Sequence, residues 1–128
     1  MNANYKQLFE LAVKASENAH APYSHFKVGA ALLCKDGTVY TGCNIENGSY
    51  PLGNCAERTA IFKAVSEGRR HFEAIAIAGS NTDDMSEPCY PCGACRQVMA
   101  EFCDDDFKII LSNQILTLNE ILPYRFKL

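Results

Sequence analysis

The amino-acid sequence predicts an α/β fold, a three-layer α/β/α sandwich built on a mixed sheet of about five strands. Three features support this prediction: an amphipathic segment near the N-terminus, two apolar segments joined by an Asp-Gly turn, and a later alternation of helical and strand patterns. A hairpin adds antiparallel strands, whereas strand–helix–strand crossovers add parallel ones. We expect one domain spanning residues 1–128, a length sufficient to bury a core without disulfides.

The first elements follow from hydrophobic spacing and turn residues. Apolar residues recur every three or four positions between about residues 4 and 18, which predicts an amphipathic helix that ends before Pro22. The Asp36-Gly37 pair lies between two apolar segments and therefore predicts a β-hairpin. The expected hairpin strands are Phe26–Cys34 and Thr38–Cys43, with Cys34 opposite Val39.

The second half of the chain alternates between helix and strand patterns. A loop rich in Asn, Gly and Ser precedes it at residues 44–54, and Gly68 marks the expected end of the first of these helices. We predict helices at about 55–67, 93–103 and 118–122, and strands at 73–79 and 107–111. Because parallel crossovers bring helix N-termini to one edge of the sheet, residues that open the first two of these helices should meet there.

Composition excludes several classes of function. The formal net charge of −3 and the lack of a basic stripe argue against nucleic-acid binding. Polar residues interrupt the first twenty positions, where an export signal needs an apolar stretch, and no apolar run approaches the ~20 residues of a membrane helix. The seven cysteines form an odd set, which favours metal binding or free thiols over a disulfide framework. We expect a cytoplasmic protein that binds neither nucleic acid nor membranes.

Two short motifs carry the candidate chemistry. Cys55 is followed two positions later by Glu57, and Cys92 and Cys95 are separated by two residues. A catalytic zinc ion needs three protein ligands, an open position for water and a group that moves protons. The three thiols and the carboxylate match that requirement, and the N-termini of two helices would favour the thiolate forms of Cys55 and of the pair Cys92 and Cys95.

A closed structural zinc site is the main alternative. Structural zinc takes four ligands, and Cys89 forms a second, overlapping Cys-x-x-Cys pair with Cys92. Two features favour the open site instead, namely Glu57 beside Cys55 and the proline that directly precedes Cys92. The remaining cysteines, Cys34, Cys43 and Cys103, are expected to be small buried apolar residues.

The motif Cys-Ala-Glu followed by Pro-Cys-Gly-Ala-Cys is typical of zinc-dependent nucleoside and nucleobase deaminases. More closely, the chain resembles the small, homotetrameric cytidine deaminases of the cytidine/deoxycytidylate deaminase superfamily. The Gly-Cys-Asn-Ile-Glu-Asn segment is more diagnostic than the metal motif alone. The resemblance covers nearly the whole chain, through the segments 21–26, 28–32, 42–47, 54–60 and 91–98.

The resemblance implies the fold of this family, its reaction and the roles of individual residues. The reaction would be hydrolytic deamination of cytidine and 2′-deoxycytidine to uridine and 2′-deoxyuridine with release of ammonia, in pyrimidine salvage. Cys55, Cys92 and Cys95 would hold one Zn²⁺ per subunit, with Glu57 as the proton shuttle. Nucleoside contacts would come from Phe26 beside the base, the Ala56 backbone N–H on the pyrimidine carbonyl, Asn44 and Glu46 on the ribose hydroxyls, and Tyr50 and Phe126 in a neighbouring subunit's pocket.

The charge of the metal site adds a further expectation. Three thiolates around Zn²⁺ leave a net charge of −1, which should make bound water less acidic than three histidines would. We therefore expect Arg58 to donate hydrogen bonds to ligand sulfurs as an offsetting cation, with Gln97 as a second candidate for this role.

Three rival functions stay open at this point. The first is deamination of a related aminopyrimidine nucleoside such as blasticidin S, against which the Asn44 and Glu46 pair argues. The second is an interaction module that is stabilised by structural zinc and has no enzymatic activity. This alternative predicts four thiol ligands and a dispensable Glu57. The third is nucleic-acid editing, which the net charge disfavours.

Overall fold

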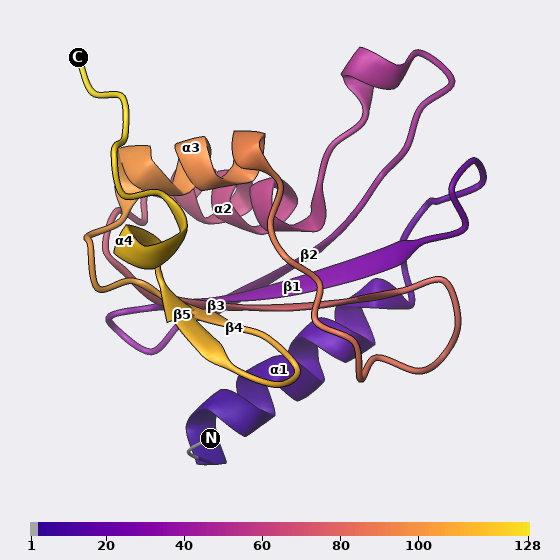
Figure 1. Ribbon diagram of the computed structural model, residues 1–128, viewed down its shortest axis with the longest axis horizontal. Helices are drawn as coiled ribbons and strands as arrows, with labels where there is room; N and C mark the ends of the chain where they lie inside the picture. The colour runs from indigo at the N-terminus through magenta and orange to yellow at the C-terminus, as the bar shows by residue number, and fades with distance from the viewer. Residues whose placement is uncertain (1–2) are drawn as a thin grey trace.

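The structure, a computed structural model, describes residues 3–128 as a five-stranded sheet between two helical layers (Figure 1). Helix α1 lies on one face, and α2 and α3 lie on the other (Figure 1). This arrangement confirms the predicted three-layer α/β/α sandwich. The elements are α1 (Ala3–Ser16), β1 (Lys27–Cys34), β2 (Val39–Cys43), the short 3₁₀ helix η1 (Tyr50–Leu52), α2 (Ala56–Ser66), β3 (Phe72–Ser80), α3 (Gly93–Phe102), β4 (Lys108–Ile110), β5 (Ile115–Thr117) and α4 (Leu118–Ile121).

The sheet has the strand order β2-β1-β3-β4-β5 and is mixed. Strand β1 pairs antiparallel with both β2 and β3, whereas β3 and β4 are parallel and β5 returns antiparallel to β4. The connection through α2 therefore passes over β1, and the connection through α3 joins neighbouring strands. Both helices reach the same face of the sheet, as right-handed crossovers require.

The turn of the β-hairpin differs from the expectation. Leu33, rather than Cys34, lies opposite Val39. The Cys34 N–H donates to the carbonyl of Thr38 at 2.9 Å, and Gly37 has a φ of 93°. A three-residue loop with glycine in the left-handed region replaces the expected two-residue turn, because glycine adopts this φ without steric cost.

The two faces of the sheet bury different kinds of side chain. Along β3, Ala74, Ala76 and Ala78 pack in a cluster under α1. The alternating positions Ile75 and Ile77 join the larger cluster under α2 and α3. This alternation follows from the two-residue period of a strand. The larger cluster contains the following buried residues: Ala30, Leu32, Cys34, Tyr40, Ala56, Ala60, Ile61, Ala64, Phe72, Ile75, Ile77, Cys95, Met99, Phe107, Ile109, Leu111 and Leu118.

Two glycines let helices approach the sheet closely. A Cβ atom at Gly29 would lie 1.9 Å from the Ala12 carbonyl oxygen of α1. A Cβ atom at Gly42 would lie 2.7 Å from the Ala56 carbonyl oxygen, in the first turn of α2. Gly42 therefore sets the depth at which α2 begins, directly after Cys55.

Within residues 3–128, no helix combines the length and the apolar composition that a membrane span needs.

Candidate metal centre

The N-termini of α2 and α3 bring the candidate ligands together. Cys55 and Cys92 are the N-cap residues of these two helices, with extended backbone at φ −78° and −67°. Neither cysteine side chain caps its own helix, so both thiols are available to a ligand. Cys95 lies in the first turn of α3 and is fully buried. The crossover topology thus joins segments 37 positions apart in the sequence.

The three sulfur atoms have the spacing of metal ligands. The Sγ atoms of Cys55 and Cys92 are 3.7 Å apart, and those of Cys92 and Cys95 are 3.5 Å apart. All three lie within 4.8 Å of one another. Tetrahedral zinc with Zn–S bonds of ~2.3 Å separates its sulfur ligands by about 3.8 Å, so the cluster fits this ion.

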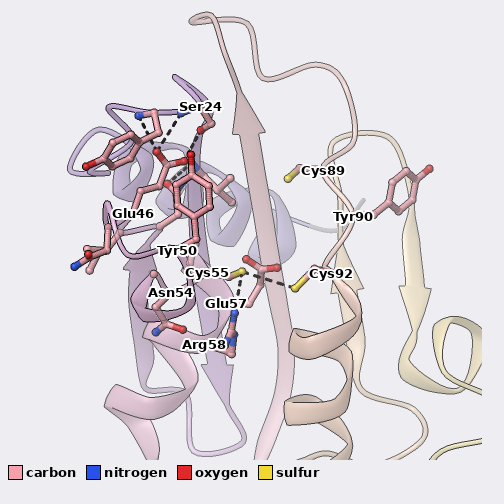
Figure 2. A pocket seen from close by; sticks show the side chains of 17 residues that line it. Ser24, Glu46, Tyr50, Asn54, Cys55, Glu57, Arg58, Cys89, Tyr90 and Cys92 are labelled. Carbon is pink, nitrogen blue, oxygen red and sulfur yellow. Dashed lines mark hydrogen bonds between the residues drawn. The ribbon is translucent and has the colours of Figure 1, made fainter.

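Glu57 lies beside the cluster without belonging to it. Its side chain is 4 % exposed, and Figure 2 shows its carboxylate next to the sulfurs of Cys55 and Cys92. Burial is the main cause that raises the pKa of Glu57 to about 7, and the negative charge of Cys55 acts in the same direction. A carboxyl group with such a pKa exchanges protons near neutral pH, which is what general acid–base chemistry requires.

Arg58 makes the contact expected of an offsetting cation. Its Nη2 atom donates to the Cys55 Sγ at 3.3 Å (Figure 2). Hydrogen bonds from Cys95 and from Arg58 hold the pKa of the Cys55 thiol well below its usual value. The same contact with Cys55 raises the pKa of the Arg58 guanidinium, which keeps the cation charged. Among the described residues, the buried Nε of Arg58 has no hydrogen-bond partner.

Cys89 does not complete a four-sulfur site. Among residues 3–128, the group whose sulfurs lie within reach of one ion contains Cys55, Cys92 and Cys95 only. Cys89 instead packs against Gly79, where a Cβ atom would lie 2.7 Å from its sulfur. Burial raises the pKa of the Cys89 thiol to about 11, so this group stays protonated at neutral pH. The closed structural site therefore lacks its fourth ligand.

An open cavity of about 570 Å³ lies in front of the cluster. Its walls come from the segment after α1, the loop after β2, the start of α2 and the segment before α3. Four residues with expected substrate contacts line it, namely Asn44, Glu46, Tyr50 and Ala56. The complete lining is Tyr23, Ser24, Val28, Asn44, Ile45, Glu46, Asn47, Tyr50, Gly53, Asn54, Cys55, Ala56, Glu57, Arg58, Cys89, Tyr90 and Cys92.

Comparison with known proteins agrees with this geometry. Residues 2–111 match the family model described as the cytidine and deoxycytidylate deaminase zinc-binding region. The chain belongs to this deaminase family.

Relatives and solved structures of the family cover the chain almost completely. A protein of Halalkalibacterium halodurans named cytidine deaminase is 55 % identical over 126 residues, which is 94 % of this chain and 92 % of that one. A crystal structure of cytidine deaminase from Burkholderia pseudomallei matches with a TM-score of 0.87 at 46 % identity, covering 98 % of this chain and 100 % of that chain. A blasticidin-S deaminase of Bacillus cereus is 32 % identical over 130 residues, covering 94 % of this chain and 93 % of that one.

Asn44 and Glu46, the polar pair expected from the deaminase motif, make contacts with the segment that leads into β1 and with the beginning of that strand. The Asn44 amide accepts from the Val28 N–H and donates to the Phe26 carbonyl, each at 2.8 Å. The Glu46 carboxylate accepts from the backbone N–H groups of Tyr23 and Ser24. Each side chain retains unused hydrogen-bonding capacity toward the cavity, because a carboxylate and an amide offer more sites than these contacts use.

Three other residues with a predicted role lie outside the cavity lining, namely Phe26 and Phe126 from the resemblance and Gln97 from the charge of the metal site. Phe26 is 38 % exposed, and its ring lies against Gly79, as the Cys89 sulfur does. Phe126 is 68 % exposed in the C-terminal tail. Gln97 donates from Nε2 to the Phe126 carbonyl at 3.3 Å, so its amide contacts the tail rather than the sulfur cluster.

Several residues of the deaminase site carried no expected role. Ser24 and Tyr90 line the cavity, and Tyr23 forms an edge-to-face pair with Tyr50 at a centroid distance of 6.2 Å. Arg96 donates from Nε to the Pro91 carbonyl at 2.8 Å and thereby braces the turn before Cys92. For Ser24 and Tyr23 the only signal was their place inside the Ala-Pro-Tyr-Ser-His-Phe motif. Nothing in the spacing of Arg96 or Tyr90 indicated a site.

Proposed function

We propose that the chain is a zinc-dependent cytidine deaminase, a hydrolase that converts cytidine and 2′-deoxycytidine to uridine and 2′-deoxyuridine and releases ammonia. The observation that carries the proposal is the set of three sulfurs at metal-ligand spacing beside a buried carboxyl that stays outside the ligand group. An open metal position next to a proton carrier is the arrangement that hydrolysis of an aromatic amine needs. We assign this activity to one catalytic domain, residues 1–128.

Cys55, Cys92 and Cys95 would hold the zinc ion, one per subunit. Zinc, when bound there, supplies a nucleophilic oxygen at neutral pH because it lowers the pKa of water. Arg58 offsets part of the thiolate charge through its contact with the Cys55 sulfur at 3.3 Å. This offset keeps the site suited to activating water despite its three anionic ligands.

Glu57 moves the protons of the reaction. Its carboxylate accepts the proton that water loses and donates it to the ring nitrogen next to the amine-bearing carbon. Protonation of this nitrogen makes the amine-bearing carbon more electrophilic despite the aromaticity of the ring. The oxygen of water can then form a C–O bond to that carbon. Glu57 then accepts the proton of the newly attached hydroxyl group and passes it to the amine. The C–N bond breaks to release ammonia as the C–O bond becomes the carbonyl of the product. A pKa of about 7 suits both directions of transfer.

The cavity walls would bind the nucleoside. The Ala56 N–H, near the start of α2, would donate to the pyrimidine carbonyl, and Phe26 would lie beside the base. Asn44 and Glu46 would bind the ribose hydroxyls, which are uncharged donors and acceptors.

A homotetramer would complete the cavity. Tyr50 is 77 % exposed at the cavity mouth, and Phe126 is 68 % exposed in the tail. Aromatic side chains so exposed on one chain suit contact with a second copy. We propose that these two residues reach the pocket of a neighbouring subunit and that Gln97 supports Phe126 through its backbone contact.

Glu57→Gln provides the deciding test, with Glu101→Gln as the matched control. Glu101 is an exposed acid on α3, away from the cavity lining. Ultraviolet monitoring of cytidine should show that Glu57→Gln loses activity by about 10²-fold or more, because the amide cannot accept and donate the proton as the carboxyl does. Zinc content should stay near one per chain in both variants, and Glu101→Gln should turn over like the unsubstituted protein. Full activity of Glu57→Gln would contradict the proposal.

Deamination of blasticidin S is the second candidate, supported by the 32 % identity to a blasticidin-S deaminase. Parallel turnover of cytidine and blasticidin S distinguishes the two. The ribose-binding pair favours cytidine.

A further inference from the structure

We propose that Ser24 is a positioning residue for sugar recognition, which locks the Glu46 carboxylate to the segment that carries Phe26. The proposal rests on the proposed function and concerns how its ribose-binding side of the cavity is built. Ser24 lies on the cavity wall beside Glu46 and Tyr50 (Figure 2).

The Glu46 carboxylate is surrounded by donors from one dipeptide. Its Oε1 atom accepts from the Tyr23 N–H at 3.0 Å and from the Ser24 N–H at 3.1 Å. Its Oε2 atom accepts a short hydrogen bond from the Ser24 hydroxyl. The Ser24 hydroxyl is the main cause that lowers the pKa of Glu46, so the group remains an anion. Within residues 3–128 the hydroxyl is the one donor to Oε2, so together with the two N–H groups on Oε1 it fixes the rotation of the carboxylate.

The same hydroxyl also organises the backbone that leads to Phe26. The Ser24 Oγ accepts from the Phe26 N–H at 3.0 Å. His25, between them, has a φ of 59°, and it is the one non-glycine residue in the left-handed region within residues 3–128. Such a conformation is uncommon for a residue with a side chain and persists where surrounding contacts enforce it. The Ser24 hydroxyl is one of these contacts.

Asn44 fastens the other side of Phe26. Its amide bonds the Phe26 carbonyl and the Val28 N–H, and its own carbonyl accepts from the His20 N–H at 3.0 Å. The Glu46 N–H donates to the His20 carbonyl at 2.8 Å. The two proposed sugar-binding residues are thus also the anchors of the segment that carries the base-flanking aromatic.

The three hydrogen bonds leave part of the acceptor capacity of the Glu46 carboxylate unused. An ionised carboxylate has about four acceptor positions, and three of them are used here. The remaining position can accept one hydroxyl of the sugar. Because the Ser24 hydroxyl bonds Oε2, it sets the direction of the remaining acceptor position of the Glu46 carboxylate. Without the hydroxyl, the carboxylate can rotate, and its bond to the sugar weakens.

Ser24→Ala removes the hydroxyl, Ser24→Thr keeps it, and Ser49→Ala is the matched control on the neighbouring loop. In the part of the chain that the structure describes, the Ser49 hydroxyl makes no hydrogen bond, and Ser49 does not line the cavity. The assay measures kcat and KM for cytidine, 2′-deoxycytidine and 3′-deoxycytidine with the zinc-loaded protein. Ser24→Ala should raise KM for cytidine about three- to tenfold, the range of the net contribution of one ordinary hydrogen bond, with kcat within about twofold. Ser24→Thr and Ser49→Ala should stay within about twofold of the unsubstituted protein.

The substrate series separates positioning from general damage to the fold. The KM penalty of Ser24→Ala should disappear for the deoxynucleoside that lacks the hydroxyl bound by Glu46. An equal penalty on all three substrates would overturn the proposal, and so would normal kinetics on cytidine. Should Ser24→Ala fail to fold, Ser24→Cys replaces it, because a thiol keeps the size but is a weak donor. Inability of the unsubstituted protein to deaminate cytidine would instead refute the proposed function.

Discussion

The two faces of the central sheet differ in the size of the side chains that they bury and in the number of helices that they support. Under α1 the strands present small residues such as Ala31, Ala74 and Ala76, and the helix approaches so closely that Gly29 has no room for a Cβ atom. Under α2 and α3 the strands present large residues such as Ile75 and Ile77. The first face holds one helix along its length. The second supports two helices whose N-termini meet at one edge.

The difference shows that the site depends on where helices begin rather than on how tightly they pack. Among the described residues, the sulfur cluster lies at the α2 and α3 termini, on the face with the larger core. The α1 face buries a second cluster of side chains, but among the described residues it offers no such convergence of helix ends. Substitutions matched between the two regions should therefore separate loss of stability from loss of chemistry.

The largest effect is expected for Cys95→Ala, compared with Cys34→Ala. Both cysteines are buried on the α2 and α3 face, at 0 % and 2 % exposure, but only Cys95 belongs to the sulfur cluster. Cys95→Ala should lose zinc and reduce cytidine turnover by about 10³-fold or more, because an ion that loses one of three ligands is poorly held. Cys34→Ala should keep zinc and most activity. Metal analysis and ultraviolet assays measure both, and zinc loss in Cys34→Ala alone would contradict the assignment.

Gly29→Ala and Gly42→Ala compare the two faces directly. Each added Cβ atom would meet helix backbone, at 1.9 Å from the Ala12 carbonyl oxygen and at 2.6 Å from the Ala60 nitrogen. Both variants should lower the free energy of unfolding by about 3 kcal/mol or more, as overpacking against backbone does. Urea unfolding measures this loss.

The same two variants should differ in zinc affinity. Gly42→Ala displaces the first turn of α2, which follows Cys55, and should weaken zinc retention against a chelator. Gly29→Ala should leave the affinity of the folded fraction unchanged, since α1 packs on the opposite face of the sheet from Cys55 and Cys95. Equal zinc loss in both would show that the α1 face also shapes the site.

Arg58→Gln tests the thiolate contact at the beginning of α2, with Arg70→Gln as control beyond its end. Arg58 donates to the Cys55 sulfur, whereas Arg70 donates to the carbonyls of Val65 and Arg69. Arg58→Gln should lower zinc affinity or kcat by about 10- to 100-fold, the usual cost of losing a group that supports a metal ligand. Arg70→Gln should change neither. Unchanged zinc retention and turnover in Arg58→Gln would remove the role assigned to this arginine.

Cys89→Ser should have the smallest effect. Its sulfur lies outside the ligand group, so zinc content should stay near one per chain while Cys55→Ser loses the metal. A change of activity within about threefold is expected from altered packing against Gly79. If Cys89→Ser emptied the site and Cys55→Ser did not, the ligand set would be wrong.

Most elements were predictable because their patterns are local. The periodicity of α1 and the Gly68 that ends α2 place these helices to within two residues. The sequence pattern did not predict strand β5, because its three residues are too few to show an alternation of apolar and polar side chains. This strand is defined by its pairing with β4. The predicted register of the hairpin was also wrong, because the register depends on the left-handed φ of Gly37 rather than on the Asp-Gly pair itself.

The motifs alone specify the chemical groups of the site, namely three thiols, one carboxylate and one adjacent arginine. The packing of the chain places Cys55 at 3.7 Å from Cys92, keeps Cys89 outside the sulfur cluster and brings Glu46 into contact with Ser24. The physical reason is that spacing along the chain constrains contacts within a few residues. Contacts across 22 or 37 positions depend on how helices and loops pack against the sheet.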